Sequence, residues 1–96
     1  MAVLLNTAVG SDGVLINAKK LLATKSCSYC DFTRADLRRT NLNAARLSKA
    51  NLFEANLNEA NLRGADLSTA ILETATIGSA ILCKTLMPWG EDNSNC

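Results

Sequence analysis

The stretch that decides the fold runs from Cys30 to Trp89 and reads as consecutive blocks of five residues: CDFTR, ADLRR, TNLNA, ARLSK, ANLFE, ANLNE, ANLRG, ADLST, AILET, ATIGS, AILCK and TLMPW. The first residue of a block is small, the second is usually Asp or Asn, and the third is large and apolar. The third positions, which we predict to form the core, are Phe32, Leu37, Leu42, Leu47, Leu52, Leu57, Leu62, Leu67, Leu72, Ile77, Leu82 and Met87. Such regularity indicates a single repeated structural unit.

A period of five fits neither an α-helix nor a flat strand. On a helix, each step of five residues rotates the side chain by about 140° beyond a full turn, so the leucines would scatter around the helix. On a strand, side chains alternate with a period of two, so successive leucines would point to opposite faces. A chain that bends after every block directs every third residue to one interior axis. This predicts a solenoid whose coils hydrogen-bond to one another.

The blocks resemble the A(D/N)LXX pattern of the pentapeptide repeat family, in which four blocks make one coil of a right-handed quadrilateral β-helix. The resemblance implies an all-β solenoid of about three coils for this chain. Residues twenty apart would then stack, which places Arg34 beside Glu54 and Arg39 beside Glu59. These opposite charges on adjacent coils favour that register, although each exposed pair contributes only about 0–1 kcal/mol.

Before the repeat, the residues from Gly13 to Ala23 predict an amphipathic helix. Its apolar face consists of Val14, Leu15, Ala18, Leu21 and Leu22. We expect this face to cap the first coil, because the open ends of solenoids need covering. The chain then divides into an N-terminal segment with the helix and a connector (1–29), the repeat (30–89) and a C-terminal tail (90–96).

The sequence gives no sign of a membrane segment. No apolar run approaches the roughly 20 residues of a membrane span. Met1–Gly10 is apolar but lacks a basic start and a clear cleavage site, which favours a frayed or strand-like terminus over a signal peptide. The predicted helix is short and has few basic residues for a membrane-surface helix. We therefore expect no membrane partner.

The four cysteines fall into two pairs along the chain. Cys27 and Cys30 form a CxxC, but a redox site would need a thioredoxin-like setting, and a zinc site would need further ligands in a chain without histidine. We expect a buried small residue beside a loop thiol, or a local disulfide. Cys83 points outward from its block and Cys96 ends the tail. They either form a disulfide that pins Trp89 over the last coil, or stay free as they would in a cytosol.

Three apolar residues stand where Asn or Asp is usual, namely Ile71, Ile81 and Leu86. They should project outward, and so many large aliphatic side chains are too many to leave in water. Two alternatives remain open: they pack under the tail, or they form a self-association surface of a homodimer.

No constellation of residues resembles an active site. The chain has no histidine, one tyrosine and no glycine-rich phosphate loop, so we expect no catalytic residue, cofactor or metal. The net charge of +1, from 10 basic and 9 acidic residues, gives no strong field toward nucleic acid. We therefore expect a non-enzymatic structural or protein-interaction module whose protein partner is unknown.

The resemblance also implies an alternative function. Some pentapeptide repeat proteins mimic DNA and bind a topoisomerase such as gyrase, but that role goes with a longer and strongly acidic rod, whereas this chain is short and nearly neutral. The expected compartment is the cytoplasm. The thylakoid lumen or periplasm is the alternative, because the end of the chain resembles small cyanobacterial and thylakoid-lumen members of the family and because a disulfide would need an oxidising compartment.

Overall fold

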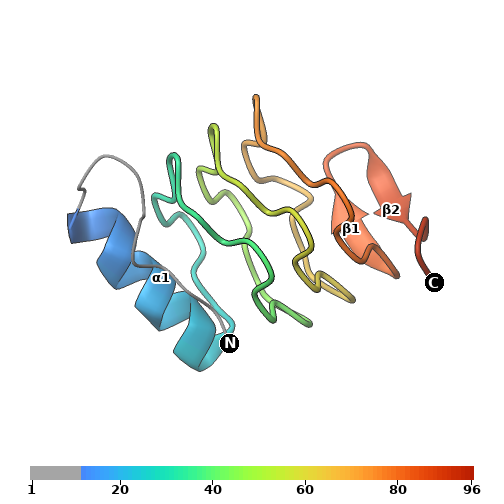
Figure 1. Cartoon of the computed structure of the whole chain (residues 1–96), viewed down its shortest axis with the longest axis horizontal. Coiled ribbons are helices and arrows are strands. Elements are labelled where there is room, and N and C mark those ends of the chain that lie inside the picture. Colours follow the sequence, from blue (N-terminus) through green and yellow to red (C-terminus); the bar gives the residue numbers. More distant parts are fainter. Residues whose placement is uncertain (1–11) are drawn as a thin grey trace.

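The computed structural model of this chain describes residues 12–96, with side chains from Asn17 onward. Helix α1 (Asp12–Thr24) is followed by a stack of coils and by an antiparallel hairpin of β1 (Thr85–Met87) and β2 (Gly90–Asp92). Figure 1 shows α1 at one end of the stack and the hairpin at the other. The expectations for Met1–Gly10 and for the side chains of Val14 and Leu15 lie outside the described residues.

The coils are held together by parallel bridges between residues that are twenty positions apart. The bridges run from the Ser26–Arg46 pair to the Asp66–Leu86 pair at every fifth residue. The sequence predicts that the repeat starts at Cys30. The ladder begins one block earlier, at Ser26. The reason is that the block containing Cys27 has the same geometry as the later blocks, with the Cys27 amide donating to the Arg46 carbonyl at 2.9 Å.

The interior of the stack is a column of large apolar side chains flanked by small ones. The third residues from Phe32 to Leu67 are fully buried, and the first residues that follow them, such as Ala45 and Ala60, are buried as well. Cys27 also fills a buried third position. The prediction that it lies in a connector is therefore wrong. Of the core prediction, Leu72 and Ile77 are only partly buried.

Leu72 and Ile77 are less buried because no further coil covers them. After Met87 the chain turns back along β1, so that Leu86 pairs with Glu91. The residues that would otherwise stack on the block of Leu72 are used in this hairpin.

The corners of the coils are left-handed. The fifth residue of nearly every block has a φ near +60°, for example +61° at Ala44 and +68° at Gly64. This backbone region is unfavourable for residues with a Cβ, by about 1–2 kcal/mol each, and is open to glycine. The bends that the five-residue period required are therefore made at the cost of local backbone strain at many non-glycine residues.

Helix α1 packs on the first coil. Ala18 and Leu21 are buried in the same apolar cluster as the coils, and Leu22 packs partly against it. The side-chain amide of Asn17 donates to the backbone carbonyl of Asp31 at 3.2 Å, so it satisfies one acceptor on the exposed side of this coil. Within residues 12–96, no helix has both the length and the apolar character needed to span a bilayer.

Candidate functional site

The sides of the stack carry ion pairs between adjacent coils. Arg34 Nε lies 2.7 Å from Glu54 Oε1, and Arg39 Nε lies 2.6 Å from Glu59 Oε1. Both pairs join residues twenty apart, so the register expected from the charges is confirmed. The side chains remain substantially exposed, and each pair therefore contributes little to stability.

The Asp and Asn residues at the second position of each block hold the turns. Their side-chain oxygen accepts a hydrogen bond from the backbone N–H two residues later. The Arg63 N–H, for example, donates to Asn61 Oδ1 at 3.1 Å. Seven blocks share this bond, with acceptors Asp31, Asp36, Asn41, Asn51, Asn56, Asn61 and Asp66. The side chain thus bonds the nearby backbone, which explains the composition of the repeat.

These turn bonds also change the acidity of the aspartates. The hydroxyl and the backbone N–H of Thr33 lower the pKa of Asp31, because both donate to its carboxylate. The guanidinium of Arg38 lowers the pKa of Asp36 in the same sense, at 2.9 Å. The N–H and hydroxyl of Ser68 lower the pKa of Asp66. All three groups are held in the charged form, so none is suited to donate a proton near neutral pH.

One shallow depression lies on a side of the stack. Its volume is about 340 Å³, and it is lined by Arg38, Arg39, Asn58, Glu59, Gly78 and Ser79. Both of its arginines are engaged by carboxylates, Arg38 by Asp36 and Arg39 by Glu59. A side chain at Gly78 would be crowded, because its Cβ would lie 3.0 Å from Asn58 Oδ1.

The arrangement in this depression offers no acid–base pair or nucleophile. Asn58 Oδ1 accepts the Gly78 N–H, so it serves the backbone of the coil above. Among residues 12–96, no three His, Cys, Asp or Glu side chains gather in a way that could hold a metal ion.

The three outward aliphatic residues do not form one patch. Ile71 bridges Asn51, Ile81 bridges Asn61 and Leu86 bridges Asp66. Ile71 and Ile81 are thus half a coil apart, since a coil contains twenty residues. Ile71 is 48% exposed and Leu86 is 40% exposed, and Leu86 pairs with the tail through Glu91. The expected surface made of all three residues is therefore not assembled within one copy of the chain.

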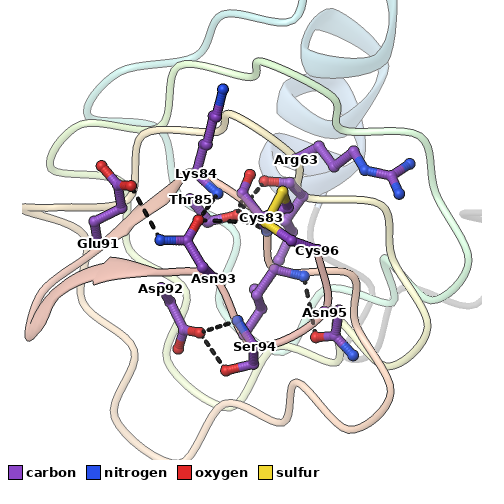
Figure 2. Close-up of a disulfide and its surroundings, with 12 residues drawn as sticks. Arg63, Cys83, Lys84, Thr85, Glu91, Asp92, Asn93, Ser94, Asn95 and Cys96 are labelled. Carbon is purple, nitrogen blue, oxygen red and sulfur yellow. Dashed lines mark hydrogen bonds between the residues drawn. A yellow bond between two sulfur atoms is a disulfide. The ribbon is translucent and has the colours of Figure 1, made fainter.

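The C-terminal tail is held against the last coil rather than loose. Figure 2 shows the disulfide between Cys83 and Cys96, whose Cα atoms are 4.8 Å apart. The side-chain oxygen of Asn93 accepts the Lys84 N–H at 2.7 Å, and that of Asn95 accepts the Leu82 N–H at 3.3 Å. The tail thus satisfies backbone donors of one block with amide oxygens.

Trp89 does not fold over the end of the stack as expected. It is 62% exposed, and its indole N–H donates to Asp92 at 3.3 Å. The hairpin turn carries it away from the coil axis. Cys27 and Cys30 are also joined in a disulfide, so all four cysteines are paired.

The remaining side of the last coil, from Ala70 to Ser79, is an open edge. Most other blocks donate two backbone N–H groups to the next coil; Leu57 and Glu59, for example, donate to Thr76 and Gly78. No acceptor from residues 12–96 meets the corresponding N–H groups, which are those of Leu72, Thr74, Ile77 and Ser79. We call the segment 70–79 the open edge. The sequence pattern alone did not reveal it, because the five-residue spacing of the large apolar residues continues through it.

Comparison with known proteins agrees with this geometry. A family model for pentapeptide repeats matches residues 30–68 with eight copies. The chain belongs to the pentapeptide repeat family. Structures of this family imply a right-handed quadrilateral β-helix, and the twenty-residue spacing of the bridges fits four blocks per coil.

Three solved pentapeptide repeat structures are similar to the chain. HetL, involved in heterocyst differentiation regulation in the cyanobacterium Nostoc sp. strain PCC 7120, is 33% identical with a TM-score of 0.50 over 68% of this chain and 33% of HetL. Rfr23 from the cyanobacterium Cyanothece 51142 is 35% identical with a TM-score of 0.45, and AT2G44920 from the Arabidopsis thaliana thylakoid lumen is 35% identical with a TM-score of 0.33. Both of these alignments cover 57% of this chain and 41% of the relative.

The pentapeptide repeat chain therefore spans only a third to about two fifths of the length of these relatives. A search of curated proteins found no match.

Proposed function

We propose that this pentapeptide repeat chain is a non-enzymatic structural or protein-interaction module, built as about three coils that α1 closes at the N-terminal end. The observation that carries this proposal is the pairing of its surface groups. The Arg and Glu side chains of adjacent coils bind one another, and the aspartates bind turn N–H groups. Such groups hold the register of the coils and present a flat polar surface.

The capping role of α1 is supported by its buried residues. Leu21 is fully buried against the first coil, and it is followed by the partly buried Leu22. Replacing Leu21 with Asp places an unpaired charge in the apolar cluster, which should expose the first coil and lead to aggregation. The neighbouring Lys20 is exposed, so Lys20→Asp is the matched control. Equal solubility and thermal stability of the two variants would rule out a cap.

The paired cysteines support an oxidising compartment. Disulfides persist in compartments such as a periplasm or a thylakoid lumen and are rare in a reducing cytosol. We therefore favour such a compartment over the cytoplasm for this chain, whose four cysteines all form disulfides. Mass mapping of thiols in protein isolated from its source under alkylating conditions tests this. Recovery of four alkylated cysteines would reverse the preference.

Affinity capture from an extract of the source organism tests the interaction role. The folded chain should retain a protein in fixed stoichiometry. An unrelated pentapeptide repeat stub of equal length serves as the control. Equal capture by both would argue against a specific module. Inhibition of gyrase supercoiling by the chain would instead favour the DNA-mimic alternative.

A further inference from the structure

The open edge differs from the rest of the last coil in what it leaves unpaired. Within residues 12–96 it presents four backbone N–H groups without acceptors, at Leu72, Thr74, Ile77 and Ser79. In the adjacent block the equivalent N–H groups have acceptors. The side-chain oxygens of Asn93 and Asn95 accept the N–H groups of Lys84 and Leu82. Among residues 12–96 nothing accepts from these four N–H groups, which therefore form a row of donors that an added strand can meet.

The same edge is apolar on its inner side. Leu72 and Ile77 are only partly buried, although they belong to the core column, and Ile71 is 48% exposed beside them. An extended segment laid along the edge would cover these side chains. It would also supply main-chain carbonyls to the four donors, in the manner of β-strand addition.

The carboxylates around the edge select the charge of such a segment. Glu54 lies one coil below Thr74, and Glu59 lies one coil below Ser79. Both are paired with arginines of the first coil. Glu73 on the edge itself is exposed and forms no ion pair with any residue between 12 and 96. Thr74 and Ser79 occupy the layer above Glu54 and Glu59. A lysine or arginine of an added segment would therefore meet Glu73, which lies on the edge itself.

A second copy of the chain fits this edge poorly. Two identical edges placed against each other contain more donors than acceptors, because each block offers two N–H groups for one carbonyl. Their glutamates would also face each other, and like charges repel at such a contact. The complement that the edge requires is rich in acceptors and positively charged.

We propose that the open edge, residues 70–79, binds an extended segment of a partner protein in which apolar residues alternate with lysine or arginine. The segment adds as a strand to the last coil. This inference rests on the proposed interaction function and assigns it to one end of the molecule.

Amide chemical shifts of the ¹⁵N-labelled chain test the proposal directly. The probe is a nine-residue peptide, blocked at both ends, that alternates valine with lysine; its control replaces each lysine with glutamate. We expect saturable shifts and slower hydrogen exchange at the amides of Leu72, Thr74, Ile77 and Ser79. The lysine peptide should bind about tenfold more tightly than the glutamate peptide.

Two charge reversals make the test specific. Glu73→Lys changes the open edge, whereas Glu91→Lys makes the same change on the exposed β2 strand of the tail. We expect the first to weaken lysine-peptide binding about fivefold and the second by less than about twofold.

Several outcomes would overturn the assignment. The first is an absence of chemical-shift changes at a millimolar concentration of peptide, or changes confined to other faces. The second is equal binding of both peptides. The third is the same changes on concentrating the chain alone, which would identify a second copy as the occupant. A source-organism partner that is captured equally by the Glu73→Lys variant would disprove the edge site while leaving the interaction function intact.

Discussion

Ala44 and Gly64 occupy the same corner of adjacent coils, with φ of +61° and +68°. A Cβ at Gly64 would meet Ala44 at 3.9 Å, which is an ordinary contact, so backbone preference rather than space separates the two residues. We expect Ala44→Gly to stabilise the fold and Gly64→Ala to destabilise it, each by about 1 kcal/mol. Urea denaturation measures both changes. Shifts of the same sign in the two variants would contradict the strain argument.

Leu62 tests the interior of the stack. It is fully buried, so Leu62→Lys would bury a charge without a partner and should prevent folding at ambient temperature. Asn43→Lys introduces the same side chain at an exposed position one coil below Arg63, and it should change stability by less than about 0.5 kcal/mol. Circular dichroism melts compare the two. A cooperative melt of Leu62→Lys at the native temperature would refute an interior position.

At the residue scale, periodicity predicts direction better than it predicts contacts. The third positions point inward because the five-residue period leaves no other arrangement. Asn58, in contrast, reads as an ordinary outward residue, yet its side chain accepts the Gly78 N–H. That bond exists because Thr76 stands where an Asn or Asp would otherwise hold the turn. Cys27 was missed for a similar reason, since a thiol in a core position does not resemble leucine.

The turns of the coils connect their stability to pH. Asp31, Asp36 and Asp66 bind protons more weakly in the folded chain than in the unfolded chain, where the pKa is 3.8. They therefore stabilise the fold above about pH 4, and this stabilisation is lost as the pH falls through their lower folded pKa values. We expect the melting temperature to fall as the pH drops below 3.8.

The triple variant Asp31→Asn, Asp36→Asn and Asp66→Asn isolates this effect. Asparagine keeps the oxygen that accepts the turn N–H, as Asn41 and Asn61 do in the native chain. We expect a melting temperature somewhat below that of the native chain at pH 7, because the charged carboxylates are gone, and a shallower loss in acid. An unchanged acid dependence would show that other carboxylates control it.

At the element scale, local signals predicted the helix, and the Cys83–Cys96 disulfide was one of two predicted alternatives, whereas the strand pairing of the tail was not predicted. The apolar spacing placed a helix at 13–23, and α1 extends one residue beyond each end, from Asp12 to Thr24. The β1–β2 hairpin was not predicted because the TLMPW block continues the repeat pattern, although Met87 pairs with Gly90. The disulfide and the Asn93 and Asn95 side-chain bonds, which no period encodes, hold the returning tail on the last coil.

The whole molecule depends on the Cys83–Cys96 disulfide to hold its C-terminal end. We expect the Cys83→Ser, Cys96→Ser variant to lose about 3 kcal/mol of unfolding free energy on the chain-entropy model. The Cys27–Cys30 disulfide closes a much shorter loop. The Cys27→Ser, Cys30→Ser variant should therefore lose about 2 kcal/mol or less of unfolding free energy on the same model. Denaturation followed by the fluorescence of Trp89, the single tryptophan, reports on both variants. A smaller loss for the Cys83 variant than for the Cys27 variant would contradict this ranking.

Because the bridges join residues twenty apart, the number of five-residue blocks sets the angle between the two ends of the stack. Adding one five-residue block would rotate the tail by a quarter of a coil relative to α1, and would advance it along the axis by only about 1.2 Å, given a coil spacing of about 4.8 Å. Adding twenty residues would leave the angle unchanged and lengthen the stack by one layer. Duplication or loss of a single block therefore changes the angle between the two ends of this solenoid. Duplication or loss of a whole coil changes only the distance between the two ends.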